Sequence, residues 1–80
     1  MANIPMDDIL PLWNETKQHK WSAFQKTLEQ HRGKAEGIED YLVDLMLVLT
    51  RREEQSNSPF PNSPQQLYEV LNRRLEQELR

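Results

Sequence analysis

The chain has 80 residues, a formal net charge of −3 and no cysteine. A chain this short forms one domain with one small core, and the lack of cysteine excludes disulfides as its stabilising device. A second subunit is then the favoured source of extra stability. With 36% hydrophobic and 29% charged residues the chain should fold, and the mild negative charge argues against a general affinity for nucleic acid.

Neither a leader sequence nor a membrane span is expected. The segment from Met1 to Met6 carries no basic residue and is followed directly by Asp7 and Asp8, unlike a signal peptide. The longest apolar run, 41–49, is interrupted by Asp44 and is far shorter than the ~20 residues that cross a bilayer. We therefore expect a cytoplasmic protein that makes no membrane contact.

The N-terminal stretch through Leu12 predicts a short helix or turn. Asp7 or Asp8 can cap a turn, and Pro11 suits the first position of a longer helix because its missing N–H would be unpaired there. The apolar residues of this stretch are Ile4, Met6, Ile9 and Leu10. A longer helix should follow it.

That longer helix is expected over residues 12–32. Trp21, Phe24 and Leu28 follow helical spacing, although 15–20 lacks any apolar stripe. Ser22 with Gln25 three positions later could form a capping box, which would divide the region into two helices near Trp21. We favour one continuous helix, ended by Gly33 in a left-handed conformation.

The next helix is expected over 35–54, and its apolar residues cover nearly the whole circumference. Asp40 and Asp44, four positions apart, form its main polar strip. We expect Asp44 to face solvent or to pair with an arginine of the last helix. Two amphipathic neighbours cannot cover the other sides completely, and an uncovered apolar face on a small protein usually marks an association site. The leading structural hypothesis is a symmetric dimer with this helix at the interface.

The chain then passes through a polar linker, 55–63, in which Phe60 is the one apolar anchor. Ser63 is expected to cap the last helix, 64–79, with Pro64 at its first position and Gln66 completing a capping box. The fold class is therefore all-α: one domain over 1–80, a small bundle of three main helices (12–32, 35–54 and 64–79) with a short N-terminal turn or helix, completed by dimerisation.

Catalytic and metal-binding patterns are sparse. The two histidines, His19 and His31, are twelve positions apart, and only His19 has a carboxylate, Glu15, one helical turn before it. Asp40 and Asp44 could hold a proton or a cation, but a solvent-facing role is the simpler interpretation. We expect no enzyme activity, no metal, no cofactor and no small-molecule substrate.

The favoured function is a non-enzymatic protein-interaction module: a small adaptor, regulator or inhibitor, or an accessory subunit of a larger complex, that associates with itself or with another protein. Aromatic and flexible apolar side chains are the preferred anchors of such contacts. The candidate contacts are Ile9, Leu12, Trp13, Tyr41, Met46 and Val48. Each of these could instead serve the core.

The alternative is a small regulator associated with nucleic acid. Residues 15–34 hold five basic and two acidic side chains, a local charge of +3, whereas 35–50 carries −4. The candidate phosphate contacts are Lys17, Lys20, Lys26, Arg32 and Lys34. Glutamates and glutamines alternate with these residues, and the acidic stretch would repel phosphates, so mutual attraction of the two blocks is the more economical use.

Overall fold

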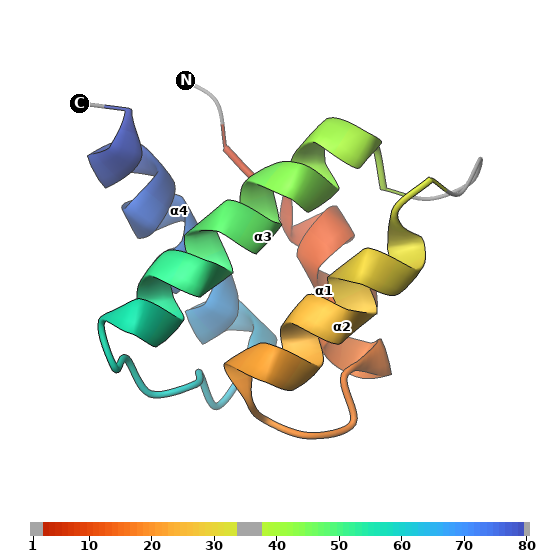
Figure 1. Ribbon diagram of the computed structural model, residues 1–80, viewed down its shortest axis with the longest axis horizontal. Coiled ribbons are helices and arrows are strands. Elements are labelled where there is room, and N and C mark those ends of the chain that lie inside the picture. The colour runs from red at the N-terminus through yellow and green to blue at the C-terminus, as the bar shows by residue number, and fades with distance from the viewer. Residues whose placement is uncertain (1–2, 34–37, 80) are drawn as a thin grey trace.

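The computed structural model describes residues 3–33 and 38–79. Over these residues the chain forms four helices and no strand, which confirms the all-α class. The helices are α1 (Met6–Glu15), α2 (Trp21–His31), α3 (Asp40–Gln55) and α4 (Pro64–Glu78). Figure 1 shows α2 and α3 crossing in front of α1 and α4.

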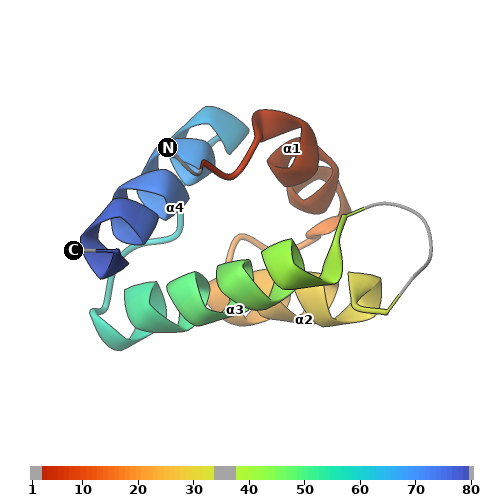
Figure 2. The same cartoon turned by 90° about the horizontal axis from the view of Figure 1, so that it is seen from above.

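The four helices close into a ring. α1 packs against α2, α2 against α3, α3 against α4, and α4 against α1. Figure 2 shows α2 and α3 as one layer, with α1 and α4 together on the other side. Each helix therefore has two helical neighbours and one side that faces outward.

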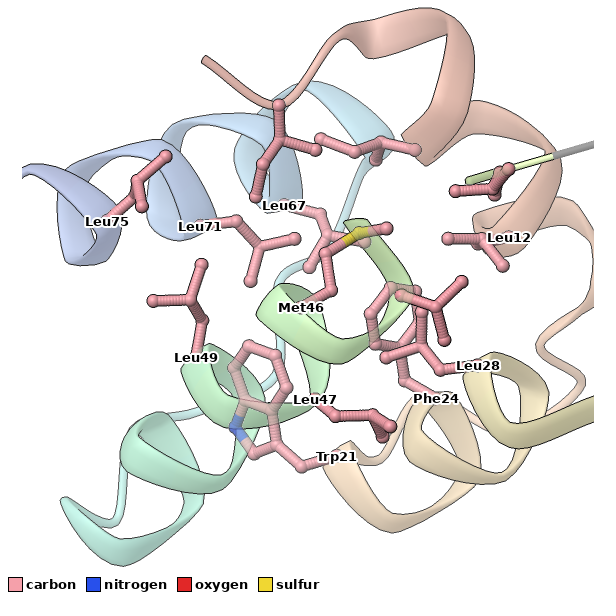
Figure 3. Close-up of a cluster of buried hydrophobic side chains, with 14 residues drawn as sticks. Leu12, Trp21, Phe24, Leu28, Met46, Leu47, Leu49, Leu67, Leu71 and Leu75 are labelled. Atoms are coloured by element: carbon pink, nitrogen blue, oxygen red, sulfur yellow. The ribbon is translucent and has the colours of Figure 1, made fainter. Parts of the chain in front are cut away.

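Apolar side chains from all four helices fill the centre of the ring (Figure 3). Leu12 of α1, Phe24 of α2, Met46 of α3 and Leu71 of α4 are each fully buried. Burying one side chain of this size stabilises the fold by about 1.5–3 kcal/mol. The hydrophobic core is formed by Ile4, Ile9, Leu12, Trp21, Phe24, Leu28, Ile38, Val43, Met46, Leu47, Leu49, Leu67, Leu71 and Leu75.

The prediction of one helix over 12–32 is wrong. Pro11 lies inside α1, which begins at Met6 after the extended residue Pro5. The break between α1 and α2 falls on the polar stretch after Glu15, and α2 begins at Trp21. Over the described residues the chain therefore forms α1 and α2 where a short N-terminal turn or helix followed by one helix over 12–32 was expected. The alternative of two helices that meet near Trp21 is the one that the structure bears out, although Lys20, and not Ser22, precedes α2 and it offers no side-chain cap.

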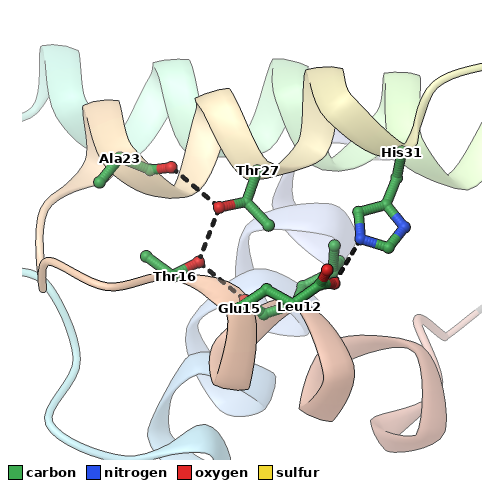
Figure 4. Close-up of polar contacts among 6 residues, drawn as sticks. All are labelled: Leu12, Glu15, Thr16, Ala23, Thr27 and His31. Atoms are coloured by element: carbon green, nitrogen blue, oxygen red, sulfur yellow. Dashed lines mark hydrogen bonds and ion pairs between the residues drawn. The ribbon is translucent and has the colours of Figure 1, made fainter.

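The break is stabilised by a buried pair of threonines (Figure 4). Thr16 takes an extended backbone conformation at the end of α1, and its Oγ1 donates to the Leu12 carbonyl at 2.7 Å. The Thr27 hydroxyl of α2 lies 3.2 Å from Thr16 Oγ1 and 3.2 Å from the carbonyl oxygen of Ala23. These contacts let a polar residue sit in the interior, where α1 turns back onto α2.

The chain enters α3 later than predicted. Gly33 has φ of +81°, the left-handed conformation expected of it, and its N–H donates to Asp40 Oδ1 at 2.9 Å. Residues 35–37 of the predicted helix lie outside the described residues. Ile38 and Glu39 precede the helix, and Ile38 inserts into the core. Two interactions thus fix the start of α3. The Ile38 side chain is buried just before the helix, and the Asp40 carboxylate in its first turn accepts the Gly33 N–H.

Asn57 ends α3 in a left-handed conformation. It has φ of +58°; its N–H donates to the Glu54 carbonyl at 3.0 Å, and the Ser58 N–H donates to the Glu53 carbonyl at 3.1 Å. This pair of hydrogen bonds is a Schellman motif, with asparagine in the position that glycine usually takes. The Trp21 indole N–H also donates to the Ser58 carbonyl, at 2.8 Å, and holds the linker against α2.

The start of α4 agrees with the prediction. Ser63 Oγ accepts the Gln66 N–H at 3.2 Å, and Pro64 is the first residue of the helix. The Gln66 side chain differs in detail, because its Oε1 accepts the N–H of Asn62, at 2.9 Å, instead of the N–H of Ser63. Both side chains still provide partners for backbone N–H groups that the helix leaves free.

Candidate interaction surface

The outward side of α3 carries an apolar stripe. Tyr41 is 64% exposed and Val48 is 47% exposed, and the partly buried Leu45 lies between them. Their spacing of four and three residues aligns them along one side of the helix. We call Tyr41, Leu45 and Val48 the outer stripe. It is the part of the over-apolar helix that neither α2 nor α4 covers.

Opposite charges flank the two ends of the outer stripe. Asp40 and Asp44 lie toward the N-terminal end of α3, and Arg51 and Arg52 lie toward its C-terminal end. All four side chains are exposed. The charge of these four side chains thus changes from acidic to basic along α3.

These charges already make ion pairs within the chain. Arg32 Nε lies 3.4 Å from Asp44 Oδ1, Arg51 Nη2 lies 4.0 Å from Glu29 Oε1, and Arg52 Nε lies 3.1 Å from Glu78 Oε1. Asp44 is exposed, as one of the two predicted alternatives stated, and it pairs with Arg32, which follows α2, and not with an arginine of the last helix. Exposed pairs of this kind stabilise a fold by only about 0–1 kcal/mol each, so they are readily exchanged.

A buried ion pair joins the other flank of α3 to α4. Glu53 is only 7% exposed, and its Oε1 accepts the Arg74 Nε–H at 2.8 Å. The hydrogen bond with Glu53 raises the pKa of the Arg74 guanidinium above its ordinary value. Sequence reasoning missed this pair, because each residue lies in a charged stretch that is typical of an exposed helix face.

The structure divides the predicted contact residues into two groups. Tyr41 and Val48 are exposed on the outer stripe, whereas Ile9, Leu12 and Met46 are fully buried and make their contacts within the chain. In the described part of the chain, two further large apolar side chains are exposed that were not predicted as contacts. They are Leu10 of α1, 42% exposed, and Leu79 after α4.

Trp13, the remaining predicted contact, is half-buried in an aromatic cluster. Its ring stacks on Phe60 at a centroid distance of 5.7 Å and lies 5.1 Å from the ring of His19. Phe60 also contacts Trp21, edge to face, at 4.9 Å. Phe60, the apolar anchor that the sequence predicted in the linker, thus holds the linker against α1 and α2.

The structure places four of the five predicted phosphate contacts, Lys17, Lys20, Lys26 and Arg32. Lys17 and Lys26 border a surface hollow of about 410 Å³ that Glu15 also lines. Lys20 precedes α2, and Arg32 is paired with Asp44. Lys34 lies outside the described residues.

The histidines occupy separate surroundings. His31 is paired with Glu15 (Figure 4), while His19 lies beside the rings of Trp13 and Phe60. Glu15 therefore pairs with His31, whereas its spacing in the sequence suggested His19. Within 3–33 and 38–79, no group of three or more histidine, aspartate or glutamate side chains is arranged to hold a metal ion.

None of the helices in the described part of the chain combines the length and the apolarity needed to cross a bilayer. Comparisons of the sequence with protein-family models and with curated proteins, and of the structure with solved structures, find no match. The candidate site is therefore defined by its own geometry: an exposed apolar stripe on α3 with acidic and basic ends.

Proposed function

We propose that this chain is a non-enzymatic protein-interaction module, acting as an adaptor, a regulator, an inhibitor or an accessory subunit, and that it binds its protein partner through the outer stripe of α3. The observation that carries the proposal is the exposure of Tyr41 and Val48 on a helix that packs against α2 and α4. Leu45 extends the same stripe between them.

The chemistry of the stripe supports a protein partner. Tyrosine is enriched among the residues that dominate binding energy, because it combines a large rigid ring with a polar hydroxyl. Apolar side chains aligned on one helix face match the way helices dock on one another. The charged residues at both ends supply the polar rim that protein interfaces usually have.

The proposal is tested by capture from an extract of the source cells on immobilised chain. We expect Val48→Glu to lose the proteins that the unmodified chain retains, since a carboxylate on the stripe would be buried without a partner. Ser22→Glu is the matched control, because Ser22 is exposed on α2 and the substitution adds the same charge. Circular dichroism and thermal unfolding check that both variants keep the fold.

Equal capture by Val48→Glu and the unmodified chain would contradict the proposal. Loss of capture by the Ser22→Glu control as well would indicate a general effect of charge, and it would also contradict a role specific to the stripe.

A further inference from the structure

We infer that the partner on the outer stripe is a second copy of this chain, with the two α3 helices lying antiparallel about a two-fold axis. The inference rests on the proposed function, since it assigns an occupant to the same stripe. Its basis is the order of charges along α3: Asp44 toward one end, Arg51 toward the other, and Val48 between them.

An antiparallel arrangement satisfies these charges and a parallel one does not. Two-fold symmetry places Asp44 of each copy beside Arg51 of the other, so the favourable pair occurs twice. In a parallel two-fold arrangement each flank faces the opposite flank of the partner helix, so Asp44 and Arg51 of one copy would lie across the seam from Arg51 and Asp44 of the other, and neither favourable pair would form. The charge order of a single helix thus selects both the partner and its direction.

The positions on the helix permit this pairing. Asp44 and Arg51 are seven residues apart, two helical turns, and so lie on the same flank of the outer stripe. In an antiparallel helix pair, each flank faces the same flank of the partner helix. The axis then passes close to Val48, about midway between the two charges.

The stripe itself is complementary in the same arrangement. Leu45 of one copy meets Val48 of the second copy, and the Tyr41 ring lies opposite Arg52 of the second copy. An arginine over a tyrosine face makes a favourable cation–π contact. Figures 1 and 2 show that α3 lies at the outside of its layer, with no other helix in front of it.

The ion pairs within one chain do not prevent this exchange. Arg51 lies 4.0 Å from Glu29, at the limit of an ion pair, and both side chains are exposed. Asp44 meets Arg32 through one carboxylate oxygen, at 3.4 Å, which leaves the other oxygen for Arg51 of the second copy. Exposed pairs are weak, so sharing or exchanging them costs little.

The dimer should be weak and dependent on concentration. α3 has 16 residues, so it is about 24 Å long at 1.5 Å per residue. One helix pair of that length falls in the small class of interfaces, below about 1,200 Å² in total. Light scattering on a sizing column, from roughly 5 µM to about 500 µM, should show the molar mass rising from 9.6 kDa toward twice that value.

Charge exchange tests the pairing directly. Asp44→Arg and Arg51→Asp should each raise the dissociation constant about tenfold or more, because each puts two like-charge contacts in the interface. The double variant Asp44→Arg/Arg51→Asp restores opposite charges and should return to within about threefold of the unmodified chain. Thermal unfolding of each variant checks that the monomer remains folded.

Disulfide cross-linking tests the direction, since the chain has no cysteine of its own. Val48→Cys lies close to the axis and should form a disulfide dimer. An equimolar mixture of Tyr41→Cys and Arg52→Cys chains should give mainly the mixed dimer, because the two positions face each other. Symmetric cross-linking of Tyr41→Cys should be slow, since those positions are about 18 Å apart along the helix pair. Ser22→Cys is the control for cross-linking outside the proposed interface, because Ser22 is exposed on α2.

Three results would overturn the inference: a mass of 9.6 kDa at every concentration, single charge variants that dimerise as well as the unmodified chain, or fast symmetric cross-linking through Tyr41→Cys. The proposed function is judged separately by the Val48→Glu capture experiment. A monomeric chain that still loses a captured protein on Val48→Glu would retain the function and lose only the inference.

Discussion

The side-chain amide of Asn72 pairs with both backbone polar groups of Ile4. Its Oδ1 accepts the Ile4 N–H at 2.7 Å, and its Nδ2 donates to the Ile4 carbonyl at 3.2 Å and to the Tyr68 carbonyl at 2.9 Å. One side chain of α4 thus supplies hydrogen bonds to an extended backbone segment 68 residues away in sequence. The Ile4 side chain is fully buried in the core.

Asn72→Ala should lower the free energy of unfolding by about 1–3 kcal/mol, because it leaves two partly buried backbone groups of Ile4 without their partners. Urea unfolding followed by circular dichroism measures the loss. Gln77→Ala, an exposed substitution on the same helix, should stay within about 0.5 kcal/mol of the unmodified chain. Equal effects of the two variants would show that the Asn72 contact does not anchor the N-terminal segment.

Arg74→Met should destabilise the chain by about 3 kcal/mol, since it leaves the buried Glu53 carboxylate unpaired. The double variant Glu53→Met/Arg74→Met should recover most of this loss, because two apolar groups can pack together where the ion pair stood. Chemical denaturation of the single and double variants gives the coupling between the two residues. Additive losses in the double variant would argue against a direct interaction.

Phe60→Ala should cost about 2–3 kcal/mol, because its ring contacts Trp13, Trp21 and Phe24 while remaining partly exposed. Tryptophan fluorescence should shift at the same time, since both tryptophans lose a ring neighbour. Asn62→Ala, exposed in the same linker, is the control. Unchanged fluorescence in Phe60→Ala would contradict the aromatic cluster.

Asp8 should make stability depend on acid pH. Burial raises the pKa of its carboxyl group above the ordinary value, and the charges of Asp7 and Glu39 act in the same direction. The folded chain then binds this proton more tightly than the unfolded chain does. The contribution of Asp8 to stability is therefore fully present below the ordinary aspartate pKa of about 3.9 and is lost as the pH rises through the raised pKa.

Asp8→Asn should consequently unfold at a higher urea concentration than the unmodified chain at about pH 7, and the difference should shrink at about pH 3.5. Urea midpoints at the two pH values give this comparison, with the exposed Glu69→Gln as the control. A difference that grows as the pH falls has the wrong sign and would contradict the raised pKa.

Local signals in the sequence were sufficient for the start of α4 and for the left-handed conformation of Gly33. Ser63, Pro64 and Gln66 specify the start of α4 through their own conformational preferences and short-range hydrogen bonds, and Gly33 adopts the left-handed conformation that its lack of a side chain permits. The end of α1 was missed because Thr16 depends on a hydroxyl of α2, eleven residues away. A contact of that kind has no short-range pattern.

The outer stripe could be predicted only in part. Periodicity identified α3 as apolar on nearly every side, but it could not tell that Met46 points inward while Val48 points outward. That distinction depends on where α2 and α4 lie, which is a property of the assembled bundle. The same limit explains why Ile9 and Leu12 were proposed as contacts and lie in the core.

The closed ring of helices also determines when contacts between helices can form during synthesis. α1 is synthesised first among the four, yet one of its two neighbours is α4, and Ile4 finds its hydrogen bonds only when Asn72 has been added. At about 5–20 residues per second, the ribosome takes roughly 3–14 s to make the chain between these two residues. Until α4 has been made, the side of α1 that α4 covers in the folded chain lacks that neighbour. We therefore expect the nascent chain to be most prone to aggregation, and most dependent on chaperones, before α4 has left the ribosome.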